Sequence, residues 1–300
     1  MTDINYFFYL SNNKLNEISN DKKINQNFGD GINQIFFEKL LHKKINILDR
    51  NDHNLFIHYF TSGSILNLVN ENSIVYGSGF ISNTSNLGDG RISNGHSKVL
   101  KKPLHIISVR GPKTRDKLIS MGIDCPANYG DPLILFPLIY YKNITPTIKY
   151  GIIPHYLDKK SKNLNTLITN LGKNDTIIID IMLHDLNYKK FINEILSCEY
   201  IITSSLHAVI MGIIYKKKTI FVQFGKKLIG DTFKFFDFFE SLDIHYTVKN
   251  IYTKDLLDNV IQVDYDKLYK LVKNMINIAP FIESSDKPKL IKRYKCLIYN

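Results

Sequence analysis

The chain has 300 residues, of which 44% are hydrophobic and 22% are charged. These proportions are typical of soluble globular proteins and exclude an extensively disordered chain. At roughly 150 residues per domain the length predicts about two domains, and a chain of this size buries a sizeable core without disulfides. No run of 18 apolar residues occurs, so a transmembrane helix is not expected.

The formal net charge of +11 comes from 34 lysines and only five arginines. Nucleic-acid-binding proteins usually concentrate arginine and carry a recognisable motif, and this sequence does neither. We therefore expect no nucleic-acid partner. A phosphorylated substrate or an anionic lipid surface remains compatible with the charge.

Cofactor and metal motifs are missing from the sequence. The three cysteines lack paired C-x-x-C spacing, which argues against a zinc site and against a disulfide framework. The segment 77–79 lacks the third glycine of a dinucleotide fingerprint, and no P-loop motif occurs. The residues after Met1 do not resemble a secretory signal. We therefore expect a cytoplasmic protein without a metal or resident cofactor.

Short apolar runs alternate with helical patterns along both halves of the chain. Strands are expected at 6–10, 56–60, 73–76, 105–109, 150–156, 176–181, 200–203 and 219–224. Helices are expected at 32–41, 65–69, 112–121, 188–196, 206–214 and 265–278. Asp30 is the expected N-cap of the first of these helices.

Strands that alternate with helices imply parallel sheets covered by helices. We expect an α/β protein of two Rossmann-like domains, residues 1–146 and residues 147–300, the second ending in a helical tail. Ligands of open α/β sheets bind beyond the carboxyl ends of the strands. The site is therefore expected in a cleft between the two domains.

The segment 203–207, with the sequence Thr-Ser-Ser-Leu-His, is the strongest candidate for chemistry. A strand that ends in hydroxyl residues where a helix begins can offer Ser204, Ser205 and free backbone N–H groups to an anion. His207 would fall in the first helical turn, where a side chain that titrates near neutral pH can donate a proton. A capped helix with a packed histidine explains the same residues equally well.

Two other strand ends carry candidate ligand-binding side chains. Arg110 follows an expected strand, and its planar fork binds phosphate or carboxylate bidentately. His155 ends the first strand of the second half, where it would orient a substrate, assist proton transfer or pack in a turn. The loops with Asp30, Ser78 and Asp131 have turn and cap chemistry as their ordinary explanation.

Seven ordered segments of the sequence resemble the polysaccharide pyruvyl transferase family. They are 27–30, 63–66, 76–80, 109–115, 129–132, 151–156 and 204–207. The resemblance implies a two-domain architecture similar to GT-B glycosyltransferases. It also implies transfer of the pyruvyl unit of phosphoenolpyruvate to two hydroxyls of a sugar, with a cyclic ketal and phosphate as products.

The resemblance gives each candidate residue a role. It implies His207 as the acid and Arg110 as a grip on the doubly anionic donor, with residues 147–300 on the donor side. The other donor-binding candidates are Ser204, Ser205, His155 and Lys234, and the acceptor-binding candidates are Asp30 and Ser78. Many family members carry arginine where this chain has Ser205, which leaves open whether other groups hold the anion or the donor differs.

Two alternatives belong to other functional classes. A glycosyltransferase of the same shape would place the diphosphate of a nucleotide sugar at the same helix N-terminus, and a non-catalytic relative would only bind glycans. In the family the acceptor is commonly a glycan on a lipid carrier. The basic charge is therefore also expected to favour transient contact with the inner face of an anionic membrane.

Overall fold

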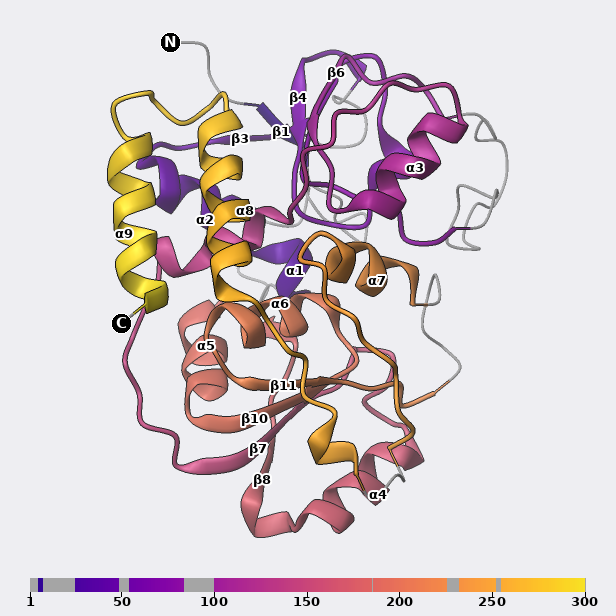
Figure 1. Ribbon diagram of the computed structural model, residues 1–300, viewed down its shortest axis with the longest axis vertical. Helices are drawn as coiled ribbons and strands as arrows, with labels where there is room; N and C mark the ends of the chain where they lie inside the picture. The colour runs from indigo at the N-terminus through magenta and orange to yellow at the C-terminus, as the bar shows by residue number, and fades with distance from the viewer. Residues whose placement is uncertain are drawn as a thin grey trace.

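The computed structural model describes residues 5–7, 25–48, 54–83, 100–184, 186–225, 232–251 and 255–299, and it contains two parallel sheets (Figure 1). The five strands of the larger sheet lie in the order β3-β1-β4-β5-β6 and are β1 (Asn5–Phe7), β3 (Asn46–Leu48), β4 (His58–Phe60), β5 (Ser73–Tyr76) and β6 (His105–Ser108). The four strands of the smaller sheet lie in the order β11-β10-β7-β8 and are β7 (Ile148–Ile153), β8 (Thr176–Ile178), β10 (Cys198–Thr203) and β11 (Lys218–Phe221). All neighbouring strands within both sheets are parallel.

Helices surround both sheets. They are α1 (Phe28–Gly31), α2 (Asn33–Leu41), α3 (Pro112–Ser120), α4 (Lys162–Leu171), α5 (Tyr188–Leu196), α6 (Leu206–Ile214), α7 (Phe233–Glu240), α8 (Tyr265–Ile278) and α9 (Lys287–Tyr299). Shorter 3₁₀ turns are η3 (Leu66–Leu68), η4 (Pro132–Leu138), η5 (Lys173–Asp175) and η6 (Leu256–Asp258). No helix within these described ranges is long and apolar enough to cross a bilayer.

The α6 helix is the central element between the sheets (Figure 1). Every one of its residues is buried, as expected for a helix that is apolar on all sides. The preceding strand β10 is the inner strand between β7 and β11. The start of α6 is thus held at the carboxyl edge of the smaller sheet and points toward the first half of the chain.

A segment of the first half is built into the second. β2 (Asn25–Asn27) pairs antiparallel with β9 (Met182–His184), and the amide of Phe28 donates to the Ile181 carbonyl over 2.9 Å. The Phe28 ring packs 4.6 Å from the Phe191 ring centroid and 5.7 Å from that of Phe136. The largest hydrophobic cluster therefore runs without a break from α2 and η4 to α5 and α6.

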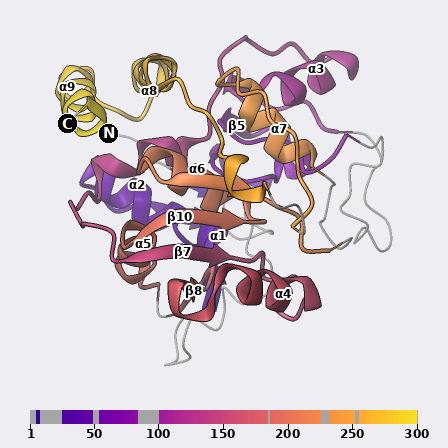
Figure 2. The same cartoon turned by 60° about the horizontal axis from the view of Figure 1, so that its bottom comes forward.

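The end of the chain returns to the larger sheet. The Tyr76 hydroxyl of β5 donates to the Met275 carbonyl of α8 over 2.8 Å, and the Tyr294 hydroxyl of α9 donates to the Ile134 carbonyl over 3.0 Å. Figure 2 shows α7 beside α3, and the two helices are in contact. The α/β fold with parallel sheets is thus confirmed. Every strand of the larger sheet precedes residue 146, but the division into two domains there stays a prediction because α7, α8 and α9 pack on the first half.

The structure corrects two local predictions. The strand expected at 56–60 begins only at His58, and Phe56 and Ile57 are 49% and 55% exposed. The N-cap prediction for Asp30 is wrong, because Asn27 caps α1 by accepting from the Gly29 amide and Asp30 lies inside that helix. The Asp30 side chain lies outside the described part of the chain, so its acceptor role stays a prediction.

Candidate functional site

The loops that follow one strand of each sheet meet at a buried polar cluster. β4 leads into Ser62, and β10 leads through Ser204 and Ser205 into α6, which carries His207 in its first turn. The Ser62 hydroxyl lies 3.3 Å from His207 Nε2. His207 and Ser62 are 9% and 4% exposed. The predicted acid is therefore placed where the carboxyl edges of the two sheets face each other.

The imidazole ring of His207 packs directly against the backbone of Gly29. A Cβ atom on Gly29 would overlap the ring at Nδ1, so only glycine allows α1 to approach this closely. Asn33 then ties α1 to the Ser62 loop, because its Nδ2 donates to the Gly29 carbonyl over 2.8 Å and to the Ser62 carbonyl over 3.4 Å. The Asn33 side chain thus fixes Gly29 and Ser62, two neighbours of His207, relative to each other.

Asp131 completes the cluster from the first half. It is fully buried, and its Oδ1 accepts the Leu133 amide over 3.0 Å as the N-cap of η4. Its Oδ2 lies 3.9 Å from His207 Nε2 and has no hydrogen-bond partner in the described residues. Burial raises the pKa of Asp131 to about 6, although the Leu133 amide, Ser62 and Arg110 act to lower it.

The surroundings of His207 disfavour its charged form. Burial, followed by the positive charges of Lys234, Arg110 and His155, lowers the pKa of His207 to about 3. At neutral pH the ligand-free site therefore holds a neutral imidazole opposite an ionised Asp131. Three other residues that the sequence analysis selected for donor chemistry, Lys234, Arg110 and His155, thus act electrostatically on His207.

The donor-side residues are organised around Ser204. Its hydroxyl accepts the His155 amide over 2.8 Å and donates to Asp158 Oδ2 over 2.7 Å, which fixes the turn after β7. The Ser205 side chain makes no capping hydrogen bond to α6. The first N–H groups of a helix have no partner inside it, so those of α6 begin beside His207 without a side-chain cap.

Arg110 is paired inside the protein and is not presented to a ligand. It is fully buried, with Nε donating to Asp237 Oδ2 over 2.9 Å and Nη1 donating to Ser64 Oγ over 2.7 Å. Its Nη2 donates to the Phe80 carbonyl over 2.5 Å. Direct contact with a donor would require one of these bonds to be exchanged, so the predicted grip stays a prediction. What the structure does give Arg110 is an electrostatic effect on His207.

The remaining predicted residues differ in their placement. Lys234 is 8% exposed in the first turn of α7, and its charge acts on His207. The Ser78 side chain is fully buried and its hydroxyl donates to the Gly63 carbonyl over 3.1 Å, and its acceptor-binding role stays a prediction. Within the described residues no cluster of three or more His, Cys, Asp or Glu side chains suits a metal ion.

Sequence reasoning missed three parts of the cluster. Ser62 precedes one of the seven matching segments, Gly29 lies inside another, and Asp131 was interpreted only as a cap. The cap interpretation is correct for Asp131 Oδ1, but the other oxygen faces His207. The position of Ser62 just after a strand was the available signal, since loops at the carboxyl ends of strands form sites in α/β proteins.

Fold and site together define an α/β protein with a histidine-centred polar site between two parallel sheets. The family model of polysaccharide pyruvyl transferase matches residues 19–223. The chain therefore belongs to the polysaccharide pyruvyl transferase family, a family of transferases. It is 29% identical over 259 residues to an uncharacterized protein of Acanthamoeba polyphaga mimivirus, covering 85% of this chain and 79% of that protein. No solved structure matches the chain.

Proposed function

We propose that the protein transfers the pyruvyl unit of phosphoenolpyruvate to two hydroxyls of a sugar and releases phosphate. The observation that carries the proposal is the placement of His207 in a member of this family. The imidazole stands at the uncapped N-terminus of α6, beside Lys234 and opposite Asp131. Such a site combines anion binding with proton transfer.

The site offers several groups to a donor with a phosphate and a carboxylate. The α6 N–H groups and helix dipole attract negative charge, and Lys234 and Arg110 add positive potential. Burial, together with these same charges, keeps His207 neutral while the site is empty. A bound trianion or dianion offsets them, which raises the pKa of His207 and allows it to carry a proton. The acid would thus be charged only when the donor is in place.

The reaction then balances without a cofactor. His207 gives its proton to the methylene carbon of phosphoenolpyruvate, and positive charge develops at the adjacent carbon. One sugar hydroxyl attacks that carbon, the carbon–oxygen bond to phosphate breaks, and the second hydroxyl attacks the resulting oxocarbenium ion. Of the two hydroxyl protons, one restores the imidazolium and the other leaves with the phosphate.

The acceptor we propose is a sugar of a surface polysaccharide, such as a capsule or exopolysaccharide, or of its lipid-linked precursor. Residues 1–146 would bind this acceptor and residues 147–300 the donor, in an arrangement similar to GT-B glycosyltransferases. The continuous apolar core between the two sheets means that any opening between them would have to leave that core intact. Asp30 and Ser78 remain the acceptor-binding candidates in the first half.

Phosphoenolpyruvate is expected to stabilise the folded protein, whereas nucleotide sugars are not. At about 100 times Kd, a ligand that binds only the folded state adds about 2.7 kcal/mol, or about 4 °C in Tm for a chain of this size. Thermal melts with each ligand measure this difference.

Mass spectrometry after incubation with phosphoenolpyruvate and a panel of glycosides then detects the added pyruvyl group. Stabilisation by nucleotide sugars alone would favour glycosyl transfer, and glycan binding without phosphate release would favour a non-catalytic role.

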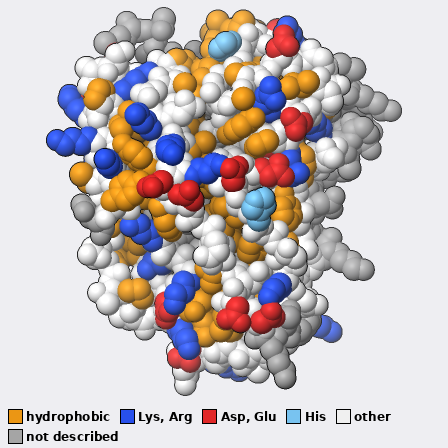
Figure 3. Space-filling view, viewed as in Figure 1, with side chains coloured by type: hydrophobic (Ala, Val, Ile, Leu, Met, Phe, Trp, Pro, Cys, Tyr) orange, Lys and Arg blue, Asp and Glu red, His pale blue; other side chains and the backbone are white. Residues whose placement is uncertain are grey.

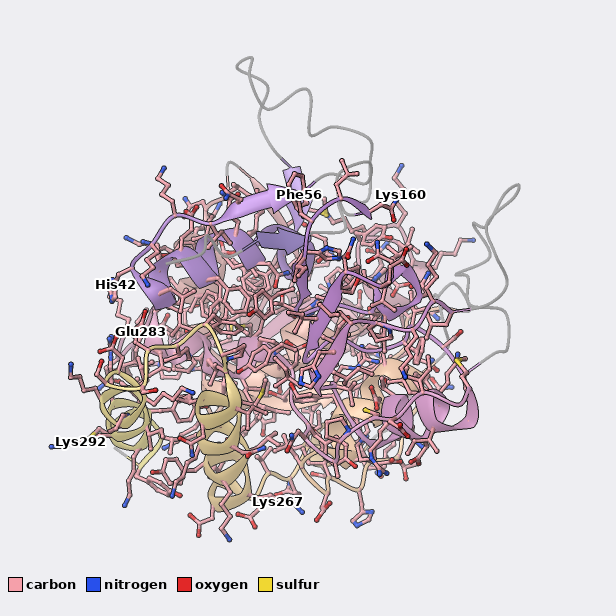
Figure 4. All side chains as sticks on the ribbon, turned by 90° about the horizontal axis from the view of Figure 1, so that it is seen from above. His42, Phe56, Lys160, Lys267, Glu283 and Lys292 are labelled. Atoms are coloured by element: carbon pink, nitrogen blue, oxygen red, sulfur yellow. The ribbon has the colours of Figure 1, made fainter. Side chains whose placement is uncertain are left out.

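We further propose that α9 mediates transient contact with an anionic membrane surface that carries the lipid-linked acceptor. The helix contains four lysines, one arginine and no acidic residue. Lys292 projects from the body of the protein in Figure 4, and Figure 3 shows cationic side chains along the edge where α9 lies. Lys289 and Lys295 are exposed on the same helix.

Replacement of Lys289, Lys292 and Lys295 together by alanine is expected to weaken binding to phosphatidylglycerol vesicles at least tenfold. Each lysine near an anionic surface contributes about 1 kcal/mol, and added salt should weaken wild-type binding too. Vesicle co-sedimentation measures the effect, with phosphatidylcholine vesicles as the neutral comparison.

The matched control replaces three lysines near α4, at the other end of the molecule (Figure 1). Lys160, Lys162 and Lys173 are all exposed, so their loss changes the net charge equally. Equal loss of vesicle binding in both triple variants would show that net charge, and not α9, governs the contact.

A further inference from the structure

We propose that Asp131 is the proton partner of His207, a positioning residue whose carboxylate supplies the counter-charge that lets the imidazole take up a proton when the donor binds. The inference rests on the proposed function for the donor, but the pairing itself is a property of the ligand-free site. Asp131 comes from the first half of the chain and His207 from the second. The two halves would therefore each supply one member of a proton-holding pair.

The Oδ2 atom of Asp131 is the main observation. A buried polar atom is usually hydrogen-bonded, because burial without a partner costs free energy. Asp131 is fully buried, yet Oδ2 has no hydrogen-bond partner in the described residues and lies 3.9 Å from His207 Nε2. An oxygen left in this state, within one small movement of an imidazole nitrogen, indicates a group kept for a second protonation state.

A purely structural role for Asp131 does not account for that oxygen. Capping of η4 uses Oδ1 alone, through the Leu133 amide. Arg110, the nearby cation, is already paired with Asp237 and with two other acceptors. Asparagine would serve equally well as a cap. Ser62 also acts on this carboxylate, but its hydroxyl lies 3.3 Å from His207 Nε2 and belongs to the same cluster. The second oxygen of Asp131 therefore faces the imidazole and its serine neighbour.

The local backbone holds Asp131 in this position. Gly130 has a φ of +129° and Gly77 has a φ of +84°, and a Cβ on Gly77 would overlap the Pro132 ring. Gly77 thus lets the loop after β5 pack directly on residues 130–132, which follow α3, and Gly130 leaves room for the Met275 side chain of α8. The carboxylate thus approaches the imidazole from a rigid turn, which is what a positioning residue requires.

The other charged groups around the pair explain why the proton moves only when a donor arrives. His207 faces Lys234, Arg110 and His155, all positive or able to become so, and faces the carboxylate of Asp131. Arg110 also acts on Asp131. In the empty site, burial and these cations together keep the imidazole neutral. An anionic donor cancels them, and the negative charge of Asp131 then favours the imidazolium.

The first test uses the ligand-free protein and does not depend on the identity of the donor. Carbon-13 NMR from pH 4 to 8 should show the Asp131 carboxyl titrating near pH 6. The His207 ring resonances should shift with the same midpoint while the imidazole stays neutral. In Asp131→Asn that midpoint should vanish from His207, whereas Asp116→Asn, which removes an exposed carboxylate on α3, should leave it unchanged. A His207 signal insensitive to Asp131 would overturn the inference.

The second test adds phosphoenolpyruvate. Calorimetry in buffers of different ionisation enthalpy should show the wild type taking up about one proton per donor bound at pH 7.5, and Asp131→Asn less than a third of that. Donor affinity should stay within threefold, while the rate of phosphate release should fall about 100-fold. Equal proton uptake by both proteins would overturn the inference. If neither protein binds phosphoenolpyruvate, the proposed function fails, and the titration of the ligand-free protein alone decides the role of Asp131.

Thermal stability separates this role from a structural one. The folded-state pKa of Asp131, about 6, lies above its ordinary value of 3.8. The folded protein therefore loses stability as pH rises from about 4 to about 6, where the unfolded chain has already released the proton that the folded protein still holds. Asparagine carries no charge, so the Tm of Asp131→Asn should equal or exceed that of the wild type above pH 6. The advantage should vanish below about pH 4. A lower Tm at pH 8 would indicate a structural carboxylate and would count against the proposal.

Discussion

Replacement of His207 by glutamine is expected to lower the rate of phosphate release by about 10²- to 10⁴-fold, the usual contribution of a general acid. Glutamine can still contact Ser62, which lies 3.3 Å from Nε2, but it cannot take up a proton. Donor affinity and Tm should therefore stay close to those of the wild type. Single-turnover phosphate release and calorimetric titration with phosphoenolpyruvate measure the two effects separately. Normal turnover by this variant would remove His207 from the acid role.

A second variant keeps the imidazole of His207 and changes only Gly29, the residue against which the ring packs. In Gly29→Ala the added Cβ would overlap the His207 ring, so the ring must change its position relative to Ser62 and Asp131. Turnover should fall at least tenfold although every titratable group remains. Gly225→Ala is the matched control, because the nearest atom to its Cβ is 3.8 Å away. Equal activity of the two glycine variants would show that catalysis tolerates a displaced ring.

The sequence predicted the elements whose signal is local. Residues 188–196 and 265–278 form α5 and α8 with the expected bounds, because apolar residues recur there at helical spacing. The apolar segment 206–214 is likewise the helix α6. Strands with exposed or irregular ends were placed less well. The run expected at 219–224 ends at Phe221 in β11, although Val222 and Phe224 are still buried.

The helices α7 and α9 were not predicted, because neither shows a clear pattern of apolar residues at helical spacing. α7 consists mainly of aromatic residues, which the sequence indicates only as core. α9 carries five cationic side chains and buries mainly Tyr294 and Ile298, so its apolar stripe is too narrow to stand out. Both helices matter for function, because one places Lys234 near His207 and the other forms the proposed membrane contact.

From the sequence, only those site residues that directly follow a predicted strand could be identified. His207, His155 and Ser204 follow strands of the smaller sheet, and their common edge follows from parallel topology. The approach of Asp131 to His207 depends on how the two halves pack, and the pairing of Arg110 with Asp237 joins residues 127 positions apart. No local pattern encodes either contact.

Removal of the Asp237 side chain is expected to lower the free energy of unfolding by about 3–5 kcal/mol, the usual effect of breaking a buried ion pair from one side. Asp237→Ala leaves the Arg110 guanidinium buried without its carboxylate. The same carboxylate accepts the Thr114 amide over 2.8 Å and the Thr114 hydroxyl over 2.6 Å, so the variant also loses the N-terminal cap of α3. Urea denaturation measures the change.

Glu240→Ala is the control on the same helix. Glu240 also joins α7 to α3, through a Lys113 contact of 2.8 Å, but both side chains are more than a third exposed. Exposed pairs contribute about 0–1 kcal/mol, so this variant should be nearly as stable as the wild type. A loss for Asp237→Ala no greater than that for Glu240→Ala would mean that the buried pair does not hold α7 in place.

Arg110→Lys extends the argument from stability to function. A lysine cannot reproduce the three directed bonds to Asp237, Ser64 and the Phe80 carbonyl, so it too should destabilise the fold. Because α7 also carries Lys234, a loosened α7 would withdraw positive charge from His207, and donor affinity should fall together with stability. If Arg110 instead contacts the donor directly, affinity for phosphoenolpyruvate should fall in Arg110→Lys far more than in Asp237→Ala at equal stability. Measuring both quantities in both variants therefore decides whether this arginine acts through α7 or on the substrate itself.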